Sequence, residues 1–119
     1  WDLMPTFCEI AKISEPNHTD GISYIPALTG KKQKKHAYLY WEFHSYGNAQ
    51  AIRMGDWKGI RLKVKNNPNA PIQLFNLKKD IGETNNIAAN HPDIIRRFTK
   101  LFKKAHTPSE RFPLFTNKK

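Results

Sequence analysis

The sequence predicts an α+β fold, in which a small four-stranded antiparallel sheet packs against a C-terminal helix. Four segments, the first of them rich in aromatic residues, are separated by short turn sequences, a pattern typical of consecutive antiparallel strands. One long stretch near the C-terminus instead repeats its apolar residues at helical spacing. The 119 residues correspond to one domain, which buries roughly 65% of the surface that its unfolded chain exposes.

The four expected strands are separated by turns that contain Gly, Asn, Asp or Pro. They span residues 36–44, 50–54, 57–64 and 72–77. Successive side chains of a strand point to opposite faces of the sheet. In the first strand, Ala37, Leu39, Trp41 and Phe43 therefore share one face, and Tyr38, Tyr40, Glu42 and His44 share the other. In the third strand, Ile60, Leu62 and Val64 form the apolar side.

Helical periodicity occurs at both ends of the chain. Near the N-terminus, Leu3, Phe7, Ile10 and Ala11 predict a short amphipathic helix. A longer helix is expected to start near Asn90 or His91. Its apolar stripe consists of Ile94, Ile95, Phe98, Leu101, Phe102 and Ala105.

We expect one domain over residues 1–119, with four parts in sequence order. Residues 1–30 form a linker helix and loop, and residues 36–77 form the antiparallel sheet. Residues 83–106 contain the helices, and residues 107–119 form a tail whose apolar side chains could dock on a larger body.

Composition and charge narrow the class of protein. Hydrophobic residues make up 39% of the chain and charged residues 25%, as in a folded globular domain. No apolar run approaches the roughly 20 residues that a membrane-spanning helix needs, and the first residues do not resemble a signal peptide. The net charge of +10 indicates an anionic partner, which could be nucleic acid, an anionic membrane or a sulfated glycan.

No residue pattern predicts a catalytic or metal centre in this chain. The one cysteine, Cys8, lies in an apolar helical stretch, where a buried thiol is expected. The five histidines lack the spacing of a zinc site. Asp80, Glu83 and Asn85 lack the alternating carboxylates of an EF-hand loop and are interpreted as turn and capping residues.

Several short motifs, in their order along the chain, resemble the C-terminal subdomain of formylglycine-dependent sulfatases, especially of the bacterial secreted arylsulfatase type in the alkaline-phosphatase-like superfamily. The resemblance spans almost the whole chain. The motifs are Trp1-Asp2-Leu3-Met4-Pro5-Thr6, Asp20-Gly21-Ile22-Ser23, Leu28-Thr29-Gly30-Lys31, Trp41-Glu42, Arg53-x-Gly55-Asp56-Trp57-Lys58, Leu74-Phe75-Asn76-Leu77 and Asp80-x-Gly82-Glu83-x-Asn85.

The resemblance implies that this chain is part of a sulfatase that hydrolyses sulfate esters of glycans, and that the catalytic centre lies upstream. The family's nucleophile arises within C-x-P/A-S-R, whereas Cys8 is followed by Glu9-Ile10-Ala11-Lys12. Calcium and formylglycine are therefore implied for an N-terminal catalytic domain, which would be the partner of this chain. The chain alone is expected to be inactive. The resemblance also implies a periplasmic or secreted location.

The same resemblance implies that the sheet lies near the mouth of the substrate cleft, where this chain would shape substrate choice. His44, Glu42 and Arg53 are the candidate substrate-binding residues. His44 could donate a charge-assisted hydrogen bond to a sulfate group, and Arg53 could pair with Glu42 across the strands. A purely structural role, as cross-strand polar pairs, is the alternative for all three.

A free-standing basic module that binds nucleic acid or a polyanionic glycan is the alternative function. The charge and the aromatic residues Tyr38, Tyr40 and Tyr46 favour it. The scattered lysines and the lack of a nucleic-acid-binding motif disfavour it.

Overall fold

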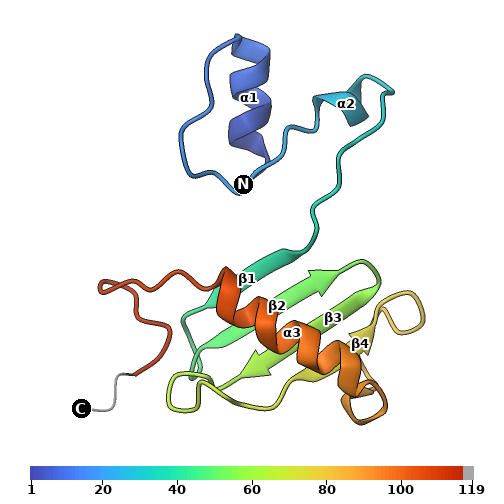
Figure 1. Cartoon of the computed structure of the whole chain (residues 1–119), viewed down its shortest axis with the longest axis vertical. Helices are drawn as coiled ribbons and strands as arrows, with labels where there is room; N and C mark the ends of the chain where they lie inside the picture. Colours follow the sequence, from blue (N-terminus) through green and yellow to red (C-terminus); the bar gives the residue numbers. More distant parts are fainter. Residues whose placement is uncertain (117–119) are drawn as a thin grey trace. The chain divides into compact units, whose positions relative to one another are not determined.

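The computed structural model describes residues 1–116 and consists of two compact units, Trp1–Ala37 and Tyr38–Lys119. Figure 1 shows the helices of the first unit and the sheet and long helix of the second. The single domain expected over residues 1–119 stays a prediction. The last three tail residues, 117–119, lie outside the described part of the chain.

The first unit contains helix α1 (Leu3–Ala11) and the single turn α2 (Ile25–Leu28). The α1 residues that are buried are Pro5, Thr6 and Cys8, so the prediction of a buried Cys8 is confirmed. The loop after the helix returns against this side. A Cβ atom on Gly21 would lie 2.4 Å from the Trp1 carbonyl oxygen, which leaves room only for glycine.

The apolar stripe that predicted α1 lies on its exposed side. Leu3, Phe7 and Ile10 are 53%, 58% and 60% exposed. The returning loop covers Pro5 and Thr6 instead, because the hydroxyl of Thr6 accepts a hydrogen bond from the Tyr24 N–H at 3.1 Å. The stripe therefore remains as an apolar surface of the described chain.

The second unit contains the predicted four-stranded antiparallel sheet, in the order β1-β2-β3-β4. The strands are β1 (Leu39–Phe43), β2 (Ala49–Met54), β3 (Trp57–Leu62) and β4 (Gln73–Asn76). β1, β3 and β4 are shorter than expected, whereas β2 begins one residue earlier than expected. Lys63 ends β3 because its backbone adopts the left-handed conformation, with φ of 56°.

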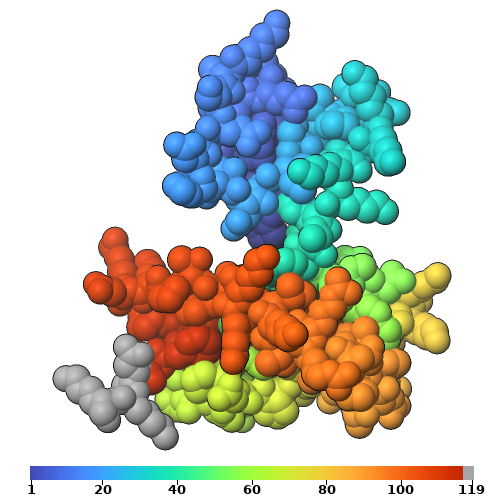
Figure 2. Space-filling view, viewed as in Figure 1, coloured from blue at the N-terminus to red at the C-terminus, as the bar shows by residue number. Residues whose placement is uncertain are grey.

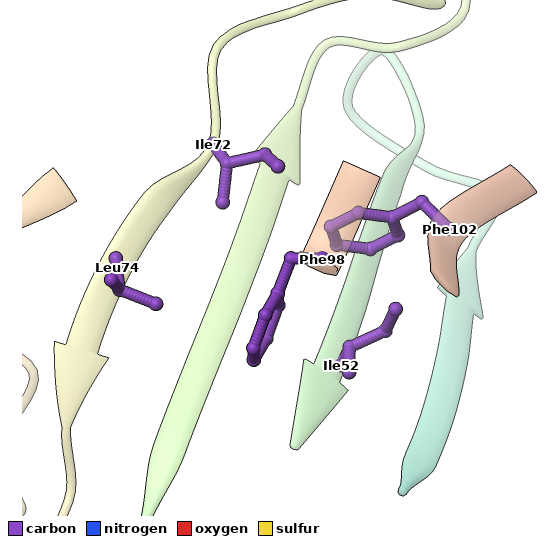
Figure 3. Close-up of a cluster of buried hydrophobic side chains, with 5 residues drawn as sticks. All are labelled: Ile52, Ile72, Leu74, Phe98 and Phe102. Carbon is purple, nitrogen blue, oxygen red and sulfur yellow. The ribbon is translucent and has the colours of Figure 1, made fainter. Parts of the chain in front are cut away.

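The long helix α3 (Pro92–Ala105) follows the short turn η1 (Ala88–Asn90) and covers one face of the sheet, as predicted (Figure 1). Phe98 and Phe102 of its stripe are completely buried. They pack against residues from β2, β4 and the segment before β4, as Figure 3 shows. The core consists of Ile52, Ile72, Leu74, Phe98 and Phe102.

The face under α3 is not the apolar side that the sequence indicated for the third strand. The strand register places Tyr40, Glu42 and Arg61 on the covered face, together with Ile52 and Gly59. Phe102 confirms this placement, since its ring lies 6.4 Å from the Tyr40 ring and 5.0 Å from the Arg61 guanidinium. Gly59 explains the choice of face: a Cβ atom there would lie 2.4 Å from Phe98, so only a glycine admits the helix this closely.

The tail after α3 folds back on its own unit. Leu114 is 1% exposed and forms a second apolar cluster with Val64 and Ala70. Its carbonyl accepts a hydrogen bond from the buried Asn48 side chain at 2.7 Å. In the space-filling view, the orange atoms of α3 and the red atoms of the tail cover strands that are visible in Figure 1 (Figure 2).

Candidate functional site

A cluster of polar side chains surrounds Glu42 at the end of β1. One carboxylate oxygen, Oε1, lies 2.6 Å from the His106 Nδ1 and accepts a hydrogen bond from the Tyr40 hydroxyl at 2.5 Å. The other oxygen, Oε2, lies 3.6 Å from the His44 Nε2. The Glu42 side chain is only 18% exposed, and the hydrogen bonds with Tyr40 and His106 offset much of the cost of its burial.

Tyr40 continues this network into the interior. Its hydroxyl accepts a hydrogen bond from the Gln50 Nε2 at 2.8 Å while it donates to Glu42. Burial raises the pKa of Tyr40, and the neighbouring Glu42 carboxylate raises it further, although the Gln50 donor opposes the shift. Tyr40 therefore stays protonated and serves as a permanent donor to Glu42.

His44 is the member of the cluster that reaches the surface. Its side chain is 36% exposed, whereas those of Glu42 and His106 are 18% and 15% exposed. The structure thus brings together two of the three candidate substrate-binding residues, His44 and Glu42. From this exposed position the His44 ring could donate a hydrogen bond to an anionic ligand.

The expected pairing of Arg53 with Glu42 is wrong. Glu42 lies opposite Gln50 on β2, and Arg53 lies opposite Leu39, so the odd-numbered Arg53 projects from the other face of the sheet. Arg53 is exposed, and its Nε donates to the Gly55 carbonyl at 3.4 Å. His106 takes the place at Glu42 that the sequence assigned to Arg53.

Arg53 instead borders a cavity of about 430 Å³ on the open face of the sheet. Lys58 and Glu83 line it as well, and the Lys58 Nζ lies 2.5 Å from Glu83 Oε1. This ion pair spans 25 residues of sequence and was not expected. Neither was the contact between His106 and Glu42, which spans 64 residues.

Asp80 organises the turn after β4, as expected. Its carboxylate accepts hydrogen bonds from the N–H groups of Thr84 and Asn85 and from the Thr84 hydroxyl. The Asn85 and Thr84 N–H groups lower the pKa of Asp80. Across residues 1–116, no three His, Cys, Asp or Glu side chains gather in a group that could hold a metal ion. No helix in the same span is long and apolar enough to cross a membrane.

Comparison with known proteins decides the family. Residues 1–108 match the family described as "N-sulphoglucosamine sulphohydrolase, C-terminal". The chain belongs to this sulfatase family. It corresponds to the C-terminal part of a sulfatase, as the motifs predicted.

Known sulfatases resemble the chain in both sequence and structure. It is 39% identical over 90 residues to Delta 4,5-hexuronate-2-O-sulfatase of Bacteroides thetaiotaomicron, covering 73% of this chain and 18% of the relative. It is 30% identical to Arylsulfatase K of Danio rerio, over 86% of this chain and 20% of the relative. A solved 2-O GAG sulfatase superimposes with a TM-score of 0.73 at 33% identity, over 87% of this chain and 23% of that structure.

The coverage values show how much of each relative's length the chain matches. The sulfatase C-terminal sequence spans about a fifth of the length of the two curated relatives. The four-stranded antiparallel sheet with its covering helix is the fold shared with the solved sulfatase.

Proposed function

We propose that this chain closes the substrate cleft of a sulfatase that acts on sulfated glycans, and that it helps to select the substrate. The relatives support the substrate class, because the names of two of them specify a hexuronate 2-O-sulfatase and a 2-O GAG sulfatase. The partner of the chain would be the N-terminal catalytic part of the same enzyme. A periplasmic or secreted location belongs to the same proposal.

The catalytic centre is proposed to lie in that N-terminal part. Cys8 is buried in α1 and is followed by Glu9-Ile10-Ala11-Lys12, which does not fit the sequence from which formylglycine forms. Calcium takes six to eight oxygen ligands. Within residues 1–116, no cluster of three or more His, Cys, Asp or Glu side chains could hold such an ion. Neither formylglycine nor calcium fits the described residues, so both would belong to the catalytic part.

His44 is the proposed substrate contact. The observation that carries this role is its exposed position beside an anchored carboxylate: Glu42 is held by Tyr40 and His106, while His44 remains 36% exposed. Glu42 would position the His44 ring, whose Nε2 lies 3.6 Å from the Glu42 Oε2. A charge-assisted hydrogen bond from His44 to a sulfate or sugar oxygen would then strengthen binding.

Arg53 is proposed as a substrate-binding residue that acts separately from this pair, since it projects from the opposite sheet face. Lys58 also lines the cavity that Arg53 borders, and its ammonium group forms an ion pair with Glu83. Arg53 would therefore supply an exposed positive charge for an anionic group.

The test replaces His44 in the sulfatase polypeptide that carries this chain. We expect His44→Ala to lower kcat/KM for the glycan substrate by roughly ten- to a hundredfold, the value of one charge-assisted hydrogen bond. The melting temperature should stay unchanged. His18→Asn, which changes an exposed histidine of the first unit, is the control and should leave kcat/KM unaltered. A lower melting temperature with unchanged kinetics would assign His44 a structural role.

Glu42→Gln separates positioning from direct binding. This variant keeps the size of the side chain but removes the carboxylate that faces the His44 Nε2 at 3.6 Å. We expect KM to rise in the variant while kcat stays close to that of the wild type. An unchanged KM would show that Glu42 does not position His44.

A further inference from the structure

A cavity of about 260 Å³ lies beneath the last turn of α3 and is separate from the exposed edge at His44. Gln50, Arg61, Lys103 and His106 line it, with Phe102 and Phe115 as apolar walls. Its volume approaches the roughly 300 Å³ at which small-molecule sites begin. The cavity therefore has room for a small ligand and contains groups that could bind one.

Arg61 is the unusual member of this lining. It is 6% exposed, and its buried Nε has no hydrogen-bond partner among the described residues. Its Nη1 donates to the Pro68 carbonyl at 3.4 Å, and its guanidinium lies 5.0 Å above the Phe102 ring. No carboxylate pairs with Arg61 within residues 1–116. A buried guanidinium without a counter-charge is costly, and an anion would offset that cost.

Gln50 gives a second, independent indication. It is 2% exposed, and its Oε1 also lacks a partner in the described part of the chain. Its Nε2 donates a hydrogen bond to the Tyr40 hydroxyl at 2.8 Å, and the residue lines the cavity. Buried acceptors such as the Gln50 Oε1 normally have a hydrogen-bond donor, which a hydroxyl group of the ligand could supply.

Two features oppose an anion here. Glu42 lies behind His106, and the carbonyl end of α3 carries partial negative charge. The negative charge of Glu42 is partly offset by its hydrogen bonds with His106 and Tyr40. Lys103 at the rim of the cavity, in the last turn of α3, opposes the helix dipole. Positive groups therefore outnumber negative ones around the cavity.

We propose that this cavity binds an oxyanion group, sulfate or phosphate, with Arg61 and Lys103 as its cationic ligands and with Gln50 accepting from a hydroxyl where the group is attached to a sugar. The Arg61 guanidinium would supply the hydrogen-bond donors to the anion. His44 does not line this cavity, so a negative result would leave its proposed substrate contact untouched.

The direct test follows the Arg61 side-chain Nε–Hε resonance by NMR in the purified chain. Sodium sulfate is titrated at constant ionic strength against sodium chloride. We expect a saturable shift with sulfate or phosphate and none with chloride. A linear drift that is equal for all three salts would overturn the proposal.

Paired lysine variants provide the matched control. Lys103→Gln should weaken sulfate binding by roughly two- to fivefold, the usual value of an exposed charged contact. Lys104→Gln makes the same charge change on the next residue, which does not line the cavity, and should leave binding unchanged. Equal weakening by both variants would mean that sulfate senses only net charge, and the site would be rejected.

Arg61→Lys keeps the charge and removes the Nε donor. It should weaken binding at least about tenfold, since a charge-assisted hydrogen bond is lost. If this variant does not fold, the Lys103 and Lys104 pair still decides the outcome.

A further experiment distinguishes a sulfate ester on a sugar from a free oxyanion as the ligand. N-acetylglucosamine 6-sulfate is compared with inorganic sulfate and with unsulfated N-acetylglucosamine. Tighter binding of the sulfated sugar than of sulfate identifies a sugar ester as the ligand, whereas equal binding identifies the free oxyanion. Equal binding of the sulfated and unsulfated sugars would contradict an oxyanion site.

Discussion

Asp2 connects three segments of the first unit through a single carboxylate. Its Oδ1 accepts a hydrogen bond from the Ile22 N–H at 2.9 Å, and its two oxygens lie 2.9 and 3.0 Å from the His36 Nε2. Burial raises the pKa of Asp2, but the Ile22 N–H and the His36 ring outweigh this effect, and the pKa falls below its ordinary value. One side chain at the start of α1 thus fixes both the loop and the segment that leads to the sheet.

The shift at Asp2 predicts acid sensitivity of the first unit. A carboxyl whose pKa is lowered by folding contributes stability above its unfolded pKa, about 3.9. That contribution is lost as the pH falls through the folded pKa. We expect the hydrogen-exchange protection factor of the Ile22 amide to decrease below about pH 4.

Asp2→Asn should produce the same loss of protection at neutral pH, because it removes the charge. Asp20→Asn, at an exposed aspartate of the same unit, is the control. Equal protection of the Ile22 amide in wild type and Asp2→Asn would show that the carboxylate does not hold the loop.

At the scale of elements, the contact between β3 and α3 depends on Gly59. A methyl group there would meet the Phe98 ring at 2.4 and 2.8 Å. We expect Gly59→Ala to lower the free energy of unfolding by about 1–3 kcal/mol through overpacking. Thermal unfolding measures the change. Gly82→Ala is the matched control, because its Cβ would meet no atom closer than 3.5 Å. Similar effects of both substitutions would contradict the close approach of helix and strand.

The tail forms a second contact between elements. Leu114 fills the cluster with Val64 and Ala70, and the Thr116 N–H donates to the Lys65 carbonyl at 2.7 Å. We expect Leu114→Ala to destabilise the second unit by about 2–5 kcal/mol, as for other buried leucines. Phe112→Ala changes a tail residue that is 62% exposed, so it should alter stability by less than about 0.5 kcal/mol. Chemical denaturation compares the two. An unaffected Leu114→Ala variant would mean that the tail does not contribute to stability.

At the scale of the whole molecule, the chain carries the fold of a sulfatase C-terminal part but none of the residues proposed to supply formylglycine or calcium. We therefore expect the purified chain to release no sulfate from an aryl sulfate, with or without added calcium. Release of inorganic sulfate is the measurement, with an active sulfatase as the positive control. Metal-dependent turnover by the pure chain would contradict the placement of the catalytic centre.

Local patterns determined the elements and the family. The apolar stripe that includes Phe98 and Phe102 predicted α3, and the turns between the strands predicted the order of the sheet, because both depend on neighbours in the sequence. The ordered motifs predicted the sulfatase family in the same way. The proximity of Glu42 and His44 also followed from strand alternation, since the two are separated by one residue.

Only the tertiary structure decided which face of the sheet is covered and which groups surround Glu42. A shift of one residue in strand pairing moves every side chain to the opposite face. The observed register separates Arg53 from Glu42, and Gly59 selects the face that admits α3. His106 reaches Glu42 from 64 residues away because α3 ends above β1, and no local pattern specifies where a helix ends across a sheet. The sequence therefore determined interactions between near neighbours, whereas long-range packing created the Glu42 cluster and the cavity at Arg61.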